Sequence, residues 1–123
     1  MKNENLNILI VDDIKVNYVI LKAMLRSLTT NIFWARDHNE AIDYIDRFPL
    51  DLVLMDFQLP EMNGLELSKK IKQKNKELPI IFQTANAHIV NAFDQEEYNY
   101  ETVLEKPIQK ELLYSTLKEF VAI

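Results

Sequence analysis

The sequence alternates five times between a short apolar run and a segment with helical periodicity. The apolar runs are residues 8–11, 32–35, 52–55, 80–82 and 103–104. The first, third and fourth runs are apolar without alternation, which is typical of strands covered on both faces. A helix after each strand predicts parallel strands joined by right-handed crossovers. The pattern therefore indicates an α/β fold, a doubly wound five-stranded parallel sheet.

The helical segments carry apolar residues at spacings of three and four. The helix expected between Asn17 and Leu28 has one stripe made of Ile20, Leu21, Met24, Leu25 and Leu28. Further helices are expected around 41–45 and 67–71, and from 112 to 121. The segment from His88 to Tyr98 has only a weak stripe.

Composition excludes several classes of protein. The 123 residues fit one domain, and we expect it to span 1–123. The net charge of −5 gives no global positive field for nucleic acid or anionic membrane. The absence of Cys excludes disulfides and thiolate metal sites. Since the start Met1–Asn5 is polar and no run reaches the roughly 20 apolar residues of a membrane span, we expect a cytoplasmic protein.

Polar side chains follow four of the five predicted strands. Asp12 and Asp13 follow the first strand, Asp56 the third, Thr84 the fourth and Lys106 the fifth. In open parallel sheets, ligands bind at the carboxyl ends of the strands near the topological switch point. We therefore expect these side chains to share one crevice.

Each of these residues also has a simple structural interpretation. Asp12 or Asp13 could cap a helix, Asp56 could be a turn residue, and Thr84 and Lys106 could be a strand end and a solvated charge. These interpretations fail jointly, because three carboxylates in one crevice repel one another without a cation. Oxygen ligands without His or Cys favour Mg²⁺, with Mn²⁺ possible.

Such a site suits phosphoryl transfer. A carboxylate can act as a nucleophile and form an acyl phosphate. Catalysis of phosphoryl transfer is mostly positioning and charge neutralisation. Lys106 supplies a point charge for one phosphoryl oxygen, and the hydroxyl of Thr84 can donate to another.

Four stretches at the strand ends follow one another at a spacing shared with one family. They are residues 8–13, 54–64, 84–85 and 106–108. With them, the chain resembles the response-regulator receiver domain of two-component systems along essentially its full length. The resemblance implies a flavodoxin-like (βα)5 receiver fold. It also implies a signalling switch, not an enzyme, that promotes its own phosphorylation and slow dephosphorylation.

The resemblance assigns roles to particular residues. It implies that Asp56 accepts the phosphoryl group and that Thr84 and Lys106 bind it. It implies a cis peptide bond between Lys106 and Pro107. It implies a metal site made of Asp12, Asp13, Asp56 and the backbone carbonyl of Gln58.

Two motifs narrow the resemblance to receivers of hybrid histidine kinases. They consist of Asp12, Asp13 and Asn17, and of Gln58, Pro60, Met62 and Gly64. The implied partner is a histidine kinase or a histidine phosphotransfer protein, and the expected state is a monomer or weak homodimer. Chain length allows either a stand-alone regulator or a receiver from a larger kinase, and the motifs slightly favour the second.

One position departs from the family pattern. Val103 stands where most receivers have Tyr or Phe, and it cannot swing inward as that ring does. Tyr98 or Tyr100 could take its place.

A docking patch is a further hypothesis. Ile14 and Tyr18 lie four residues apart, on a helix face that the core does not need, and so meet each other. With Ile108 they could receive the helices of the phosphodonor. The alternative is that they are isolated surface apolar residues, which are common.

Two other function classes remain as rivals. A metal-dependent hydrolase with an Asp nucleophile usually has a second acid two residues later, and here that residue is Gln58. A flavodoxin-like scaffold without chemistry would require an incomplete acidic site. Steady turnover of a phosphate monoester favours the first rival, and signalling without Asp56 favours the second.

Overall fold

The computed structural model describes residues 6–60, 62–92 and 100–122. Its strands are β1 (Ile8–Val11), β2 (Ile32–Ala35), β3 (Leu52–Asp56), β4 (Ile80–Thr84) and β5 (Thr102–Glu105). They form one sheet in the order β2-β1-β3-β4-β5, and every neighbouring pair is parallel. The predicted five-stranded parallel sheet is confirmed.

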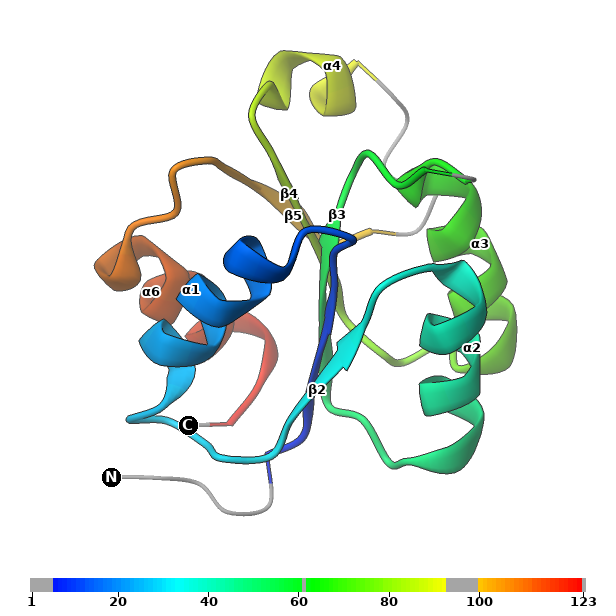
Figure 1. Cartoon of the computed structure of the whole chain (residues 1–123), viewed down its shortest axis with the longest axis horizontal. Coiled ribbons are helices and arrows are strands. Elements are labelled where there is room, and N and C mark those ends of the chain that lie inside the picture. Colours follow the sequence, from blue (N-terminus) through cyan, green and yellow to red (C-terminus); the bar gives the residue numbers. More distant parts are fainter. Residues whose placement is uncertain (1–5, 61, 93–99, 123) are drawn as a thin grey trace.

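Helices cover both faces of this sheet. They are α1 (Lys15–Leu25), α2 (His38–Arg47), α3 (Gly64–Lys74), α4 (Ala87–Asn91) and α6 (Lys110–Phe120). Figure 1 shows α1 and α6 on one side of the sheet and α2 and α3 on the other, with α4 at the top. The doubly wound arrangement is therefore also confirmed. Across the described ranges, none of the helices has the length and apolar character that a membrane crossing requires.

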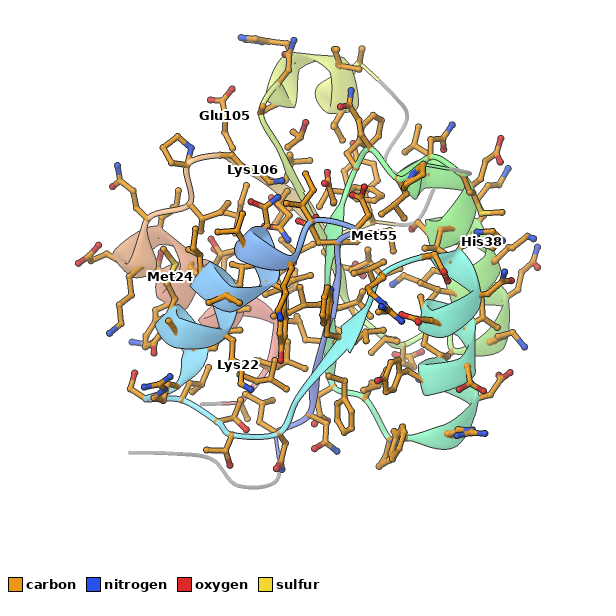
Figure 2. All side chains as sticks on the ribbon, in the orientation of Figure 1. Lys22, Met24, His38, Met55, Glu105 and Lys106 are labelled. Carbon is orange, nitrogen blue, oxygen red and sulfur yellow. The ribbon has the colours of Figure 1, made fainter. Side chains whose placement is uncertain are left out.

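Two apolar cores explain why the strands are apolar on both faces. One core joins the sheet to α2 and α3 and includes Val53, Met55, Phe82, Ala41 and Ile71. The other joins the sheet to α1 and α6 and includes Ile10, Leu54, Leu21, Leu25 and Leu117. Met55 is fully buried near the centre of the molecule, as Figure 2 shows. The central strands thus pack against helices in both directions.

Asp and Asn side chains begin two of the helices. The Asp37 carboxylate accepts a hydrogen bond from the backbone N–H of Glu40 at 2.8 Å, at the start of α2. The Asn63 side chain accepts one from Glu66 at 3.0 Å, at the start of α3. Each cap satisfies a backbone donor that the helix leaves free.

The observed helices differ from the predicted ones in detail. Helix α1 ends at Leu25, but a further turn, with the N–H of Leu28 donating to Leu25 at 2.9 Å, still buries Leu28. The expected stripe on α1 is not buried throughout, because Ile20 is 48% exposed, and at the start of α6 Leu112 is likewise 53% exposed. The spacing of apolar residues along a helix does not determine which side of the apolar stripe faces the sheet. Helix α4 is shorter than the predicted segment, and residues 93–98 lie outside the described residues.

Gly64 stands where the loop after β3 returns to the sheet. Its N–H donates to the carbonyl of Phe57 at 2.7 Å. A Cβ at this position would lie 2.7 Å from Cε1 of Phe82 and 3.1 Å from Cα of Phe57. The ring of Phe82 is fully buried and packs edge-on against Phe57, so it has little room to move. The position therefore requires glycine for close approach.

We predict that Gly64→Ala lowers the free energy of unfolding by about 1–3 kcal/mol, the range expected for overpacking. Urea unfolding measures this change. Gln73→Ala, an exposed substitution in the same helix, is the matched control and should change stability by less than about 0.5 kcal/mol. Equal stability of Gly64→Ala and the parent would contradict the proposed close approach.

Candidate functional site: an acidic cluster at the carboxyl end of the sheet

Three carboxylates meet where the chain changes sides of the sheet. Strands β1 and β3 are neighbours, with Val11 opposite Met55, so the residues that follow them lie side by side. The chain leaves β1 into α1 on one face and leaves β3 into α3 on the other. At this topological switch point Asp12, Asp13 and Asp56 each place one carboxylate oxygen within 4.8 Å of the others.

Asp12 is the buried member of the cluster. Its side chain is fully buried, and Oδ1 accepts hydrogen bonds from the Ile14 N–H at 2.9 Å and the Asn17 amide at 3.4 Å. Among the described residues, Oδ2 has no hydrogen-bond partner, and the Lys106 ammonium is 3.7 Å away. A buried carboxylate oxygen without a donor is costly unless a cation binds it. Asp12 therefore fits a metal ligand.

Asp56 lies at the end of β3 and is 7% exposed. Its Oδ1 accepts a hydrogen bond from the Gln58 N–H at 3.1 Å, and its Oδ2 lies 3.5 Å from the Lys106 ammonium. Burial raises the pKa of the Asp56 carboxyl above its ordinary value, and the nearby Asp12 adds to the rise. The Gln58 amide and the Lys106 charge act in the opposite direction. The carboxylate thus lacks part of its stabilisation without a further cation.

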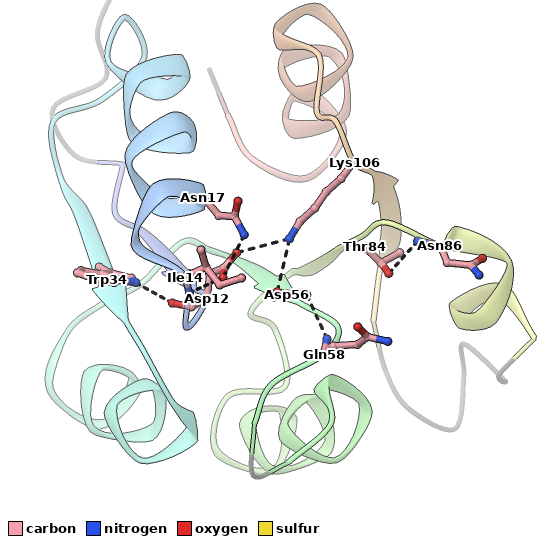
Figure 3. Close-up of polar contacts among 9 residues, drawn as sticks. All are labelled: Asp12, Ile14, Asn17, Trp34, Asp56, Gln58, Thr84, Asn86 and Lys106. Atoms are coloured by element: carbon pink, nitrogen blue, oxygen red, sulfur yellow. Dashed lines mark hydrogen bonds and ion pairs between the residues drawn. The ribbon is translucent and has the colours of Figure 1, made fainter.

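Lys106 reaches the two buried carboxylates from β5, as Figure 3 shows. Its backbone N–H donates to the carbonyl of Thr84 at 2.7 Å, which ties the end of β5 to the end of β4. The peptide bond to Pro107 is cis, as the resemblance implied. The Thr84 hydroxyl accepts a hydrogen bond from the Asn86 N–H at 3.2 Å, so its proton is available to another acceptor.

Asp13 and Gln58 lie at the solvent side of the cluster, and both are exposed. The N-cap residue of α1 is Ile14, and the helix has no side-chain cap hydrogen bond within the described part of the chain. The helix-cap interpretation of Asp13 therefore finds no support. The donor set consists of hard carboxylate oxygens without nitrogen or sulfur ligands, and it suits Mg²⁺ or Mn²⁺.

Two residues around β5, Val103 and Tyr100, pack differently. Val103 is half-buried and packs against the core on the α2–α3 side of the sheet. Tyr100 is 5% exposed, packs on Phe82 with ring centroids 5.0 Å apart, and donates its hydroxyl to the carbonyl of Val90 at 3.3 Å. Tyr98 lies outside the described residues.

Sequence reasoning missed Trp34, which supports the site from the edge strand β2. Its indole N–H donates to the backbone carbonyl of Asp12 at 2.8 Å (Figure 3). The two residues are 22 positions apart, so the contact depends on the pairing of β1 with β2. The chain has a single Trp, and its place in the second apolar run was the only available signal.

Comparison with known proteins agrees with this geometry. The sequence model of the response regulator receiver domain matches residues 8–118. The chain belongs to this receiver domain family. It is 36% identical over 121 residues to the autoinducer 2 sensor kinase/phosphatase LuxQ of Vibrio parahaemolyticus, and 31% identical over 121 residues to the aerobic respiration control sensor protein ArcB of Escherichia coli. The two alignments include 96% and 94% of this receiver but only 14% and 15% of those kinases.

Solved receiver structures share the fold. The receiver domain of the sensor histidine kinase PA1611 from Pseudomonas aeruginosa, with a magnesium ion coordinated in its active site cleft, has a TM-score of 0.83 and 30% identity. The alignment covers 94% of this chain and 96% of that one. The response regulator TrrA of Thermotoga maritima, in complex with Mg²⁺ and BeF, has a TM-score of 0.84 and 27% identity, and the alignment covers 94% and 99% of the two chains. The chain is thus a receiver of the two-component type.

The raised pKa of Asp56 predicts how the metal-free receiver responds to pH. Between the ordinary carboxyl pKa and the raised one, the folded state keeps a proton that the unfolded chain has lost. Stability should therefore fall as pH rises through this window. Asp56→Asn should remove that part of the fall and make the metal-free receiver more stable at pH 7.

Urea unfolding at several pH values, with a chelator present, measures the effect. Glu119→Gln, at an exposed site on α6, is the matched control and should leave the pH profile unchanged. A lower stability of Asp56→Asn than of the parent at pH 7 would contradict the assigned burial cost.

Proposed function

We propose that this receiver accepts a phosphoryl group on Asp56 from a phosphohistidine donor and reports it by a change in shape. The observation that carries the proposal is the pairing of a nearly buried Asp56 with a fully buried Asp12 around one ammonium group. One Lys does not neutralise two buried carboxylates and the adjacent Asp13. The excess negative charge supports a divalent ion at this place.

The transfer step follows from the site. A carboxylate oxygen of Asp56 attacks phosphorus, an O–P bond forms, and the P–N bond to the donor imidazole breaks. The nitrogen keeps the electron pair of the broken bond and takes up one proton from solvent, so the donor leaves as neutral imidazole. Mg²⁺, held by Asp12, Asp13, Asp56 and the carbonyl of Gln58, would supply positive charge to the phosphoryl oxygens. Mn²⁺ has the same ligand preference and would substitute.

Two further side chains are placed to bind the product. Lys106, already 3.5 Å from Asp56, pairs with one phosphoryl oxygen. The Thr84 hydroxyl turns its proton towards another. Because the Asn86 N–H now bonds to that hydroxyl, movement of Thr84 alters the start of α4. The Tyr100 hydroxyl donates to the carbonyl of Val90, near the end of α4, so a movement of α4 would reach the Tyr100 ring. Tyr100 therefore takes the aromatic role that Val103 cannot fill.

The phosphodonor is expected to dock on α1. A groove beside the acceptor is lined by Asn17, Ile20, Leu21, Met24, Gln83, Lys106, Pro107 and Ile108. Its wall includes Lys106, which also pairs with Asp56, so a helix seated there would bring its histidine to the acceptor. Ile14 and Ile20 are both about half exposed at this end of the molecule. Tyr18, expected in the same patch, is half-buried, packs against the core beside α1 and stacks on Trp34, so the expectation that the core does not need it was wrong.

The remaining expectations follow from the same assignment. We infer one domain over 1–123, located in the cytoplasm as a receiver, either alone or as part of a larger kinase. Its partners are a histidine kinase or a histidine phosphotransfer protein, without direct contact to nucleic acid or membrane, and it is a monomer or weak homodimer. The receiver catalyses its own phosphorylation and slow dephosphorylation, without turnover of an external substrate.

The hydrolase rival lacks one group. The residue two positions after Asp56 is Gln58, whose amide cannot transfer a proton as a general acid. The site therefore lacks the general acid that this class of hydrolase uses at that position.

Incubation with a small acyl phosphate and Mg²⁺ tests the acceptor. Intact mass should increase by one phosphoryl group, peptide mapping should place it on Asp56, and chelation of the metal should prevent it. Asp56→Asn should lose at least about 90% of the label, since the acyl phosphate needs a carboxylate nucleophile. Label at the parental rate on Asp56→Asn would overturn the assignment, and steady release of phosphate from a monoester would favour the hydrolase.

Ile20→Gln tests the docking groove. It should slow transfer from a phosphorylated histidine phosphotransfer domain about tenfold, as loss of one buried apolar contact predicts, and spare labelling by a small acyl phosphate. Leu112→Gln, equally exposed on α6 but outside the groove, is the control. Equal loss with both donors would reject the docking groove.

A further inference from the structure

We propose that Trp34 is a positioning residue for the metal site, acting through its indole N–H on the main chain of Asp12. The inference rests on the proposed metal-assisted acceptor and adds to it a residue of the edge strand. The indole N–H donates to the carbonyl of Asp12 at 2.8 Å. Trp34 itself contributes no ligand atom to the cluster of Asp12, Asp13 and Asp56.

Strand β2 holds the peptide groups of Asp12 on both sides. The N–H of Asp12 donates to the carbonyl of Ala35 at 3.0 Å, which continues the ladder between β1 and β2. On the other side of the same residue, the Asp12 carbonyl accepts from the side chain of Trp34. A carbonyl just past the last paired residue would otherwise lack a ladder partner. The indole therefore adds a hydrogen bond between the edge strand β2 and Asp12, the first residue after β1.

The side chain of Asp12 is also held in place by hydrogen bonds. Its Oδ1 already accepts from the Ile14 N–H and the Asn17 amide. With the main chain held by Trp34 and Oδ1 occupied, Oδ2 has one orientation, towards Lys106 and Asp56. Metal affinity depends on such support, because outer hydrogen bonds orient the ligands before the ion arrives.

The indole is itself held in place by stacking. Tyr18 lies on Trp34 with centroids 4.6 Å apart and planes 4° from parallel. Lys22 lies 5.7 Å from the centroid of Tyr18, and the Arg36 guanidinium lies 5.8 Å from that of Trp34. Cations near aromatic faces strengthen such an arrangement. Since Tyr18 belongs to α1, the stack joins the helix after the acidic loop to the strand that supports it.

The alternative is that Trp34 only fills space as a packed ring. The two hypotheses differ in whether the indole N–H is needed. Trp34→Phe keeps a ring for Tyr18 but removes the donor. If the N–H positions Asp12, the dissociation constant for Mg²⁺ should rise about threefold to tenfold, as loss of one hydrogen bond predicts. The Ile14 amide, which bonds to Asp12, should exchange its hydrogen faster.

Isothermal titration calorimetry with Mg²⁺ alone measures the first effect, and amide exchange by NMR measures the second. Phe33→Leu is the matched control. Phe33 is the preceding residue of β2 and packs against the core on the α2–α3 side of the sheet, with its ring centroid 5.5 Å from that of Tyr44 and 4.8 Å from that of Phe48. This variant should lose thermal stability but keep the Mg²⁺ affinity and the Ile14 exchange of the parent.

Parental Mg²⁺ affinity in Trp34→Phe, within twofold, would overturn the positioning role while leaving the acceptor assignment intact. Equal weakening in Trp34→Phe and Phe33→Leu would also overturn it, in favour of general packing. Failure of the parent itself to bind Mg²⁺ would instead contradict the proposed function, and the role of Trp34 would fall with it.

Discussion

Repulsion among carboxylates gathered at one point of the sheet is the constraint on which the receiver depends. Pairing of β1 with β3 brings the residues after both strands together. The apolar cores on either side of the sheet leave Asp12 and Asp56 almost no exposure to solvent. The ammonium of Lys106 is 3.7 and 3.5 Å from them, too far for a short ion pair with either. The carboxylates thus outnumber the positive charge at the site, and their oxygens suit a divalent ion.

The two halves of the site differ in how firmly they are held. On the metal side, Asp12 is bonded through its N–H, its carbonyl and Oδ1 to β2 and the start of α1. At the end of β4, the Thr84 carbonyl is tied to the Lys106 N–H at 2.7 Å, whereas its hydroxyl accepts only from the Asn86 N–H among the described residues, at the start of the five-residue helix α4. Under the proposed function, the firmly held Asp12 would keep a metal ion in a fixed place, and the Thr84 hydroxyl would be the group that can reorient towards a phosphoryl oxygen.

Much of this could be predicted from the sequence, because strand periodicity and the residues after each strand are local signals. The runs at 8–11 and 52–55 gave the strands, and the acidic residues behind them gave the cluster. The contact of Trp34 with Asp12 could not be predicted, since it depends on strand pairing and on the angle of one ring. The exposure of Ile20 was missed for a related reason: a stripe of apolar residues does not show which edge meets the sheet.

Paramagnetic broadening by Mn²⁺ tests the central claim most directly. In a titration of the ¹⁵N-labelled receiver, broadening should centre on the amides of Asp12, Asp13, Asp56 and Gln58, saturate at one ion, and be reversed by excess Mg²⁺. Broadening centred on other surface acids, or without saturation, would contradict a shared metal site at the ends of β1 and β3.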